Sequence, residues 1–123
     1  MILDTSAWVE FFEGTTKGEK VKDILEKDKC FTSMVSLAEI TNWSLKYGRE
    51  TAYFIDTMTK LSTILNIDKE IAVLAGRLNF ERKKLNKKWG MLDSLIAATS
   101  IAYNLRLLAK DPDYDDLPNV VIL

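Results

Sequence analysis

The sequence predicts one α/β domain over residues 1–123, with a five-stranded parallel sheet covered by helices on both faces. A chain of 123 residues is a common size for one domain. Hydrophobic residues make up 47% of the chain, as in globular proteins. Short apolar runs alternate with segments of helical periodicity, which favours parallel strands joined by helices. The predicted strands lie at residues 1–3, 30–33, 63–66, 106–109 and 120–123.

Capping signals mark the helices in the first half of the chain. The first of these helices ends at Gly14, a residue typical of helix termini. Thr16 with Glu19, and Ser36 with Glu39, have the spacing of a capping box, which starts a helix. The four helices expected in this half lie at residues 6–13, 16–27, 36–48 and about 50–61.

Two further helices are expected in the second half of the chain. Asp68 is placed to cap a fifth helix that extends to about Arg82. Its apolar residues recur at helical spacing, at Ile71, Leu74, Ala75 and Leu78. The sixth helix, at about residues 92–104, is nearly apolar, as a buried helix would be.

The amino-acid composition excludes several kinds of chemistry. The chain has no histidine, which excludes Ser-His-Asp and Cys-His catalysis and a His-ligated zinc site. Cys30 is the only cysteine, so it forms no internal disulfide, and we interpret it as a small buried hydrophobic residue. The sequence shows no signal peptide and no apolar stretch of roughly 20 residues, so we expect a cytoplasmic protein. The net charge of −1 gives no general attraction for nucleic acid.

Carboxylates from distant segments are expected at one edge of the sheet. Asp4 follows the first strand, and Asp111 and Asp113 follow the fourth. Glu39 and Asp93 are expected in the first turns of the third and sixth helices. In a parallel sheet, helix N-termini gather at the carboxyl ends of the strands, where open α/β sheets bind ligands. Those N-termini also lower the cost of bringing like charges together.

Such a cluster of carboxylates, without imidazole or thiolate, is a hard oxygen site suited to Mg²⁺ or Mn²⁺. A divalent ion there polarises a phosphodiester and activates water, so we predict hydrolysis of a nucleic-acid backbone. Each acid also has a structural interpretation: a capping box for Glu39, a helix dipole for Asp93, and a turn for Asp111 and Asp113. The functional prediction therefore depends on these acids meeting at one site.

Four blocks of the sequence resemble the PIN-domain family, especially the toxin nucleases of VapBC-type toxin–antitoxin modules. Their order and spacing are similar to the family over almost the whole chain. The blocks contain Met1-Ile2-Leu3-Asp4-Thr5-Ser6, Val35-Ser36-Leu37-Ala38-Glu39, Leu92-Asp93-Ser94-Leu95-Ile96-Ala97 and Lys110-Asp111-Pro112-Asp113-Tyr114.

The resemblance implies a PIN-like three-layer α/β/α sandwich and an Mg²⁺- or Mn²⁺-dependent endoribonuclease that cleaves RNA. It also implies a homodimer and inhibition by a cognate antitoxin protein. Asp4, Glu39 and Asp93 match the three family acids, and Asp111 matches the fourth. Asp113 is a second acid of the same motif and is expected to assist or replace Asp111 as a metal ligand.

Small differences from the family pattern also concern the site. Ser6, or alternatively Thr5, matches the hydroxyl that supports the first acid. Ala109 stands where the family often has threonine, so one supporting hydroxyl is lost. Tyr114 stands where the family often has phenylalanine, which we interpret as a conservative change.

A basic run lies just before the predicted Asp93 helix, where it is expected to contact RNA phosphates without sequence preference. The run consists of Arg82, Lys83, Lys84, Lys87 and Lys88. Its alternative interpretation is a solvated helix end whose cations favour the helix dipole. Trp89, which follows, either stacks on a base or packs in the protein. The aromatic residues between Trp8 and Phe54 are more than one helix face needs. We interpret them as part of the hydrophobic core or, alternatively, as a groove for an antitoxin helix or a dimer partner.

Other functions remain as competing hypotheses. A non-catalytic RNA-binding or protein-interaction module with a PIN-like fold is the main alternative. A phosphoaspartyl phosphatase needs Asp-x-Asp after its first strand, whereas this chain has Asp4-Thr5-Ser6. A receiver domain needs paired early acids and a phosphorylatable aspartate after its third strand, which Asp68 imitates poorly. Metal-dependent RNA cleavage separates the nuclease from all of these.

Overall fold

The computed structural model describes residues 1–123 and contains the five strands and six α-helices that the sequence predicts. The strands are β1 (Ile2–Leu3), β2 (Phe31–Ser33), β3 (Thr63–Leu65), β4 (Leu107–Ala109) and β5 (Val120–Ile122). The α-helices are α1 (Thr5–Glu13), α2 (Thr16–Lys27), α3 (Met34–Lys46), α4 (Thr51–Leu61), α5 (Lys69–Lys83) and α6 (Met91–Ala102). A short 3₁₀ helix, η1 (Pro112–Tyr114), follows β4.

All five strands belong to one sheet with the order β3-β2-β1-β4-β5. Every pair is parallel, which confirms the predicted sheet. In the register, Ile2 lies opposite both Phe31 and Leu107. Because β1 is central, the residue that follows it, Asp4, lies in the middle of the sheet's carboxyl edge.

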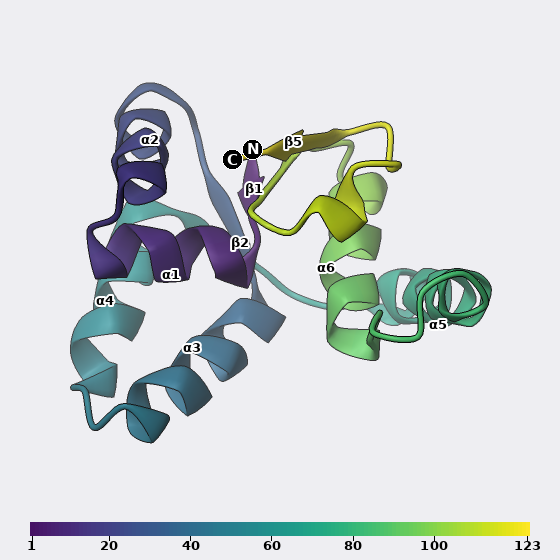
Figure 1. Cartoon of the computed structure of the whole chain (residues 1–123), viewed down its shortest axis with the longest axis horizontal. Helices are drawn as coiled ribbons and strands as arrows, with labels where there is room; N and C mark the ends of the chain where they lie inside the picture. The colour runs from purple at the N-terminus through teal and green to yellow at the C-terminus, as the bar shows by residue number, and fades with distance from the viewer.

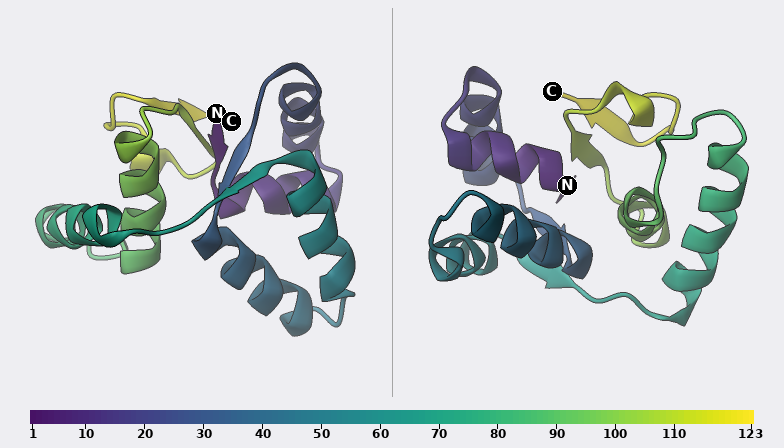
Figure 2. Two further views of the ribbon diagram at one scale, coloured as in Figure 1. Left: turned by 180° about the vertical axis from the view of Figure 1, so that it is seen from behind. Right: turned by 60° about the horizontal axis from the view of Figure 1, so that its bottom comes forward.

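Alternate residues of the strands face two separate layers of helices. Ile2 and Leu107 belong to a core cluster that includes Ile96 of α6. Leu3 and Leu108 belong to a second cluster with residues of α1, α2, α3 and α4. Figure 1 shows α1 to α4 gathered on one side of the sheet and α5 and α6 on the other, and both views in Figure 2 agree. The predicted three-layer α/β/α sandwich is therefore confirmed.

The structure corrects the predicted starts of two helices. Helix α3 begins at Met34, because the Ser33 hydroxyl at the end of β2 accepts the backbone N–H of Val35. The predicted capping box at Ser36 is therefore wrong, and Glu39 lies in the second turn of α3 rather than the first. Likewise Thr15, not Thr16, caps α2, with its hydroxyl accepting the N–H of Gly18.

Several other expectations agree with the structure. Gly14 ends α1 with a left-handed φ of 67°, and Asp68 caps α5 by accepting the N–H of Ile71. Asp93 lies in the first turn of α6, as expected. Cys30 is buried and forms no disulfide. No helix has the length and apolar character needed to cross a membrane.

Candidate active site

A cavity of about 320 Å³ opens at the carboxyl edge of the sheet. The residues around it come from β1–α1, α3, α6 and the segment after β4, as the sequence predicts. Most of them are polar or charged. They are Asp4, Thr5, Ser6, Val9, Glu10, Glu39, Asp93, Lys110, Asp111 and Tyr114. Four of the predicted acids therefore face one space.

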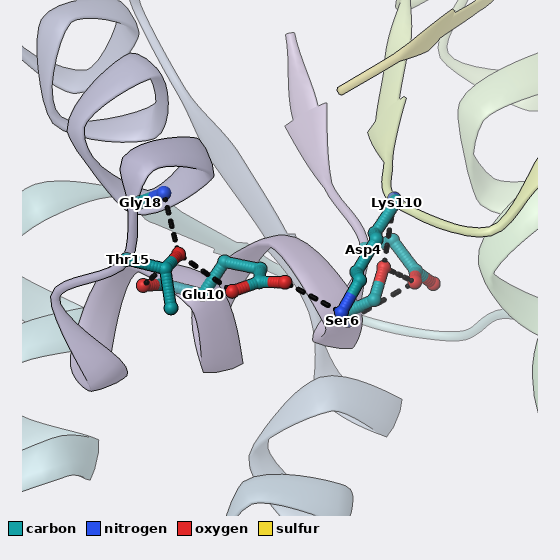
Figure 3. Close-up of polar contacts among 6 residues, drawn as sticks. All are labelled: Asp4, Ser6, Glu10, Thr15, Gly18 and Lys110. Carbon is teal, nitrogen blue, oxygen red and sulfur yellow. Dashed lines mark hydrogen bonds and ion pairs between the residues drawn. The ribbon is translucent and has the colours of Figure 1, made fainter.

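Asp4 is the innermost of these acids and is only 6% exposed. It caps α1, and its Oδ2 accepts both the backbone N–H of Ser6, at 3.1 Å, and the Ser6 hydroxyl, at 2.6 Å. The Ser6 hydroxyl in turn accepts the backbone N–H of Lys110, which ties the end of β4 to the start of α1 (Figure 3). Burial raises the pKa of Asp4 above its ordinary value, although these hydrogen bonds oppose the shift.

Asp93 is oriented by its own helix. Its Oδ2 accepts the backbone N–H of Gly90 at 3.0 Å, which is half of a capping box at the start of α6. Its Oδ1 lies 3.0 Å from the hydroxyl of Tyr114, and the same hydroxyl lies 3.1 Å from Oδ1 of Asp4. Burial, followed by the two neighbouring carboxylates, raises the pKa of Tyr114, so its hydroxyl stays protonated. Tyr114 thus lies between the two acids and places there a hydroxyl that phenylalanine lacks.

Glu39 reaches the cavity from α3 and has its own hydroxyl partner. The Thr5 hydroxyl lies 2.6 Å from Oε1 of Glu39 and 2.9 Å from the hydroxyl of Ser36. Burial raises the pKa of Glu39, and the charges of Asp4 and Asp93 raise it further. The alternatives Thr5 and Ser6 are therefore both used: Ser6 supports Asp4, and Thr5 supports Glu39.

The structure separates the two acids that follow β4. Asp111 lines the cavity and also caps η1, with its Oδ1 accepting the N–H of Asp113 at 2.9 Å. Asp113 instead borders a different hollow, formed with Arg82, Asn86 and neighbouring acids. Asp113 is therefore not among the residues that line the Asp4 cavity, and its role as a metal ligand stays a prediction.

Two charged cavity residues were absent from the predicted site. Glu10 of α1 is only 6% exposed, and its Oε1 lies 2.6 Å from Nζ of Lys110 (Figure 3). Its Oε2 accepts the hydroxyl of Thr15 at 2.6 Å. The hydrogen bonds from Lys110 and then Thr15 lower the pKa of Glu10. The sequence spacing could have predicted Glu10, because it lies four residues after Ser6 and therefore on the same face of α1.

The basic run before α6 divides into two parts. The Arg82 guanidinium pairs with Asp116 at 2.9 Å and lies 4.0 Å from the centre of the Trp89 ring. Arg82 thus has partners within the protein, and its contact with RNA stays a prediction. Trp89 is 2% exposed, so it packs in the core rather than stacking on a base. Four exposed lysines remain: Lys83, Lys84, Lys87 and Lys88.

The surplus aromatic residues form a cluster between α1, α3 and α4. Phe12 is at its centre, with ring centroids 4.6 Å from Phe54, 5.7 Å from Trp8 and 6.4 Å from Trp43. Most of this aromatic bulk is therefore core. Tyr47 and Tyr53 lie at the margin of the cluster and are 59% exposed each.

The cavity fits a divalent cation by the chemistry of its donors. Its carboxylates offer only oxygen, which Mg²⁺ and Mn²⁺ prefer. Burial and neighbouring carboxylates raise the pKa values of Asp4 and Glu39, and a cation would relieve both effects. No three acidic or cysteine side chains lie close enough to hold an ion directly. Mg²⁺ commonly binds through one or two carboxylates and several waters, so two neighbouring acids suffice.

Fold and site together define a class: a parallel α/β sandwich with an acidic cavity at the carboxyl ends of its strands. Within this class, the model of the PIN domain matches residues 1–120. The chain therefore belongs to the PIN domain family.

Relatives and solved structures agree with that assignment. The chain is 26% identical to "VapC ribonuclease Mb1587" of Mycobacterium bovis and to "Ribonuclease VapC11" of Mycobacterium tuberculosis. In both comparisons the match covers 100% of this chain and 95% of the relative. The fold is similar to a toxin–antitoxin complex of Klebsiella pneumoniae, with a TM-score of 0.77, 24% identity, and coverage of 98% of this chain and 94% of that chain. It is also similar to Mycobacterium tuberculosis VapC20, with a TM-score of 0.79, 13% identity, and coverage of 97% and 95%.

Proposed function

We propose that this protein is a metal-dependent endoribonuclease and the toxin of a toxin–antitoxin pair. The observation that carries the proposal is the single cavity into which Asp4, Glu39, Asp93 and Asp111 project from four distant segments. The family membership and the relatives named as ribonucleases support RNA as the substrate. We infer Mg²⁺ or Mn²⁺ as the cofactor from the oxygen-only donors.

The residues of the cavity have distinct roles in this proposal. Asp4 and Asp93 would hold the ion, with Glu39 and Asp111 beside it. An ion held there supplies Lewis-acid polarisation of the phosphodiester and favours ionisation of a water nucleophile. Ser6, through its hydrogen bond to Asp4, keeps that carboxylate oriented.

Lys110 is the only basic residue that lines the cavity. Its ammonium group is paired with Glu10, and its side chain is 51% exposed, so it is accessible from solvent. In the proposed complex, the Lys110 ammonium group binds a phosphate oxygen of the RNA backbone and offsets its charge. Glu10, held by Thr15, keeps the lysine at the cavity in the absence of RNA.

We also propose an antitoxin as the partner, a homodimer as the assembly and the cytoplasm as the location. Similar solved structures support the partner, since they include VapBC2 of Rickettsia felis and VapBC of Salmonella typhimurium, both bound to DNA. The aromatic cluster, with Tyr47 and Tyr53 exposed at its margin, is our candidate surface for an antitoxin helix or a second copy.

Cleavage of RNA by the purified protein tests the proposed function. The protein is incubated with a mixture of structured and unstructured RNAs in Mn²⁺, with EDTA as the control. Cleavage that appears in Mn²⁺ and disappears in EDTA is expected. If the folded protein binds RNA but leaves all of it intact in Mn²⁺, the non-catalytic alternative replaces the nuclease.

Asp111→Asn should impair cleavage much more than Asp113→Asn. Asp111 lines the cavity, whereas Asp113 does not. We therefore expect Asp111→Asn to lower kcat/KM by about 10- to 100-fold and Asp113→Asn to lower it by less than about threefold. Asparagine at position 111 keeps an oxygen for the cap of η1, so the local turn survives in both variants. Steady-state cleavage of one RNA measures the two values, and equal losses would contradict the assignment of Asp111.

Neutralising the four exposed lysines of the basic run should weaken RNA binding in a salt-dependent manner. Each phosphate contact contributes about 0.7 to the slope of log affinity against log salt for single strands, so the slope should fall by up to about 3. The variant carries glutamine at Lys83, Lys84, Lys87 and Lys88.

A matched control removes the same charge from another exposed surface. It carries glutamine at Lys20, Lys22, Lys27 and Lys29, which belong to α2 and the segment that follows it. Binding is measured by fluorescence anisotropy from low to physiological salt, with Asp4→Asn in both backgrounds to prevent cleavage. The same loss of slope in both variants would show that the basic run has no particular role.

A further inference from the structure

Tyr114 approaches the acidic cavity from the interior of the protein. Its side chain is 1% exposed and belongs to the core cluster formed with β1, β4 and α6. The ring packs edge-on against Trp89, with 4.9 Å between ring centroids. Tyr114 is nevertheless one of the residues that line the cavity. The hydroxyl therefore contacts both acids from the side of the protein core.

The hydroxyl of Tyr114 is shared between two carboxylates. It lies 3.1 Å from Oδ1 of Asp4 and 3.0 Å from Oδ1 of Asp93. The separation of these two oxygens thus cannot exceed the sum of the two distances. The Oδ2 atoms are held independently, by Ser6 for Asp4 and by Gly90 for Asp93. The Tyr114 hydroxyl has one proton, so it donates to one of the two Oδ1 atoms at a time and keeps both within reach.

From this geometry we infer that Tyr114 is a positioning residue for the metal site. Its hydroxyl lies between the Asp4 and Asp93 carboxylates and keeps them close together, an arrangement that would let both act as ligands of one divalent cation. This inference rests on the proposed function. Hydrogen-bond partners of metal ligands typically contribute 10- to 100-fold to metal affinity. Phenylalanine at this position would keep the ring and its packing but would remove the hydroxyl that lies between the two Oδ1 atoms.

Titration of the protein with MnCl₂ by isothermal calorimetry tests the inference. Tyr114→Phe is expected to bind Mn²⁺ roughly 10-fold more weakly than the wild-type protein. In cleavage assays, it should need correspondingly more Mn²⁺ for half-maximal activity while recovering most of the rate at saturation. That shift in metal dependence distinguishes positioning from a general loss of folded protein, which would lower the rate at every concentration.

Ser100→Ala provides a matched control on the same face of the sheet. The buried Ser100 hydroxyl donates to the carbonyl of Ala97 at 2.6 Å and accepts from Asn119 at 3.0 Å, away from the cavity. Its removal deletes a buried hydroxyl, as Tyr114→Phe does, and should leave the affinity for Mn²⁺ unchanged. Thermal unfolding in EDTA confirms that both variants are folded before titration.

The outcomes separate this inference from the proposed function. If the wild-type protein binds Mn²⁺ and Tyr114→Phe binds it as tightly or more tightly, the positioning role is overturned and the nuclease proposal stands. Equal weakening by Ser100→Ala also overturns the positioning role. If the wild-type protein binds no Mn²⁺ at all, the proposed metal site is itself overturned, and the role of Tyr114 with it.

Discussion

Asp4→Asn is expected to abolish RNA cleavage while leaving the protein folded. The carboxylate of Asp4 is central to the proposed metal site, and a catalytic ion contributes several kcal/mol to transition-state stabilisation. The expected loss in kcat/KM is therefore at least about 1000-fold. Asp56→Asn, at an exposed position of α4, removes the same charge and should cleave like the wild-type protein. Single-turnover cleavage in saturating Mn²⁺ measures the difference.

The hydrogen bonds around Asp4 explain why the fold should survive. In the Asp4→Asn variant, the oxygen of the new side-chain amide can accept both donors of Ser6, and its nitrogen can donate to the Tyr114 hydroxyl. That hydroxyl is then free to donate to Asp93, so both donors of Ser6 and the Tyr114 hydroxyl keep a partner. The variant also removes one of the neighbouring like charges of the cavity. We therefore expect an unfolding free energy equal to or above that of the wild-type protein at neutral pH.

The pH dependence of stability in EDTA gives a second measurement of the same effect. The pKa of Asp4 is raised in the folded state, so the folded protein binds a proton more readily than the unfolded chain. Between that raised pKa and the ordinary value of 3.8, the contribution of Asp4 to stability therefore increases as the pH falls. Asp4→Asn lacks this contribution, so its advantage should shrink towards acidic pH. A destabilised variant at neutral pH would instead favour a structural role for Asp4.

Much of the fold could be predicted because its signals are local. The alternation of apolar strands with helical segments determines a parallel sheet, and the sheet brings Asp4, Asp93 and Asp111 to one edge. Helix starts were less certain, because two hydroxyls close together can each act as a cap. Ser33 and Ser36 are both suitable capping residues. Ser33 is the cap because β2 ends at this residue and α3 begins directly after it.

The contacts of polar side chains could not be predicted in the same way. Tyr114 is 110 residues from Asp4 and 21 from Asp93, and its partners are defined only once the three segments pack together. The basic run shows the same limitation. The sequence places Arg82 beside the lysines, whereas in the structure Arg82 pairs with Asp116 and lies over the ring of Trp89. Sequence patterns thus placed Asp4, Asp93 and Asp111 at one edge of the sheet, whereas the groups that orient them required the structure.

Gly18 shows how a residue without chemistry can determine the geometry beside the site. It lies in the first turn of α2, where glycine costs about 1 kcal/mol relative to alanine in an exposed helix. A Cβ at this position would lie 2.1 Å from the carbonyl oxygen of Glu10 and 3.2 Å from Cα of Phe11. These are backbone atoms of α1, so no side-chain rotation can relieve the overlap. Glycine is therefore needed for the close approach of α1 and α2.

Gly18→Ala is accordingly expected to be the most destabilising of the substitutions considered. The two helices must separate, which disturbs the hydrogen bonds from Gly18 to Thr15 and from Thr15 to Glu10 (Figure 3). Overpacking against backbone should cost about 3 kcal/mol, which exceeds the gain in helix propensity and lowers Tm by about 10 °C. Thermal and urea-induced unfolding measure the change.

Gly76→Ala is the control that separates crowding from helix propensity. Gly76 is also in a helix, α5, but a Cβ there would meet nothing within 4 Å. The same substitution should therefore raise the unfolding free energy by up to about 1 kcal/mol at this position, with the opposite sign to Gly18→Ala. Stabilisation by both substitutions would mean that α1 and α2 do not approach so closely. The position of Glu10, and with it the anchoring of Lys110 at the cavity, would then need another explanation.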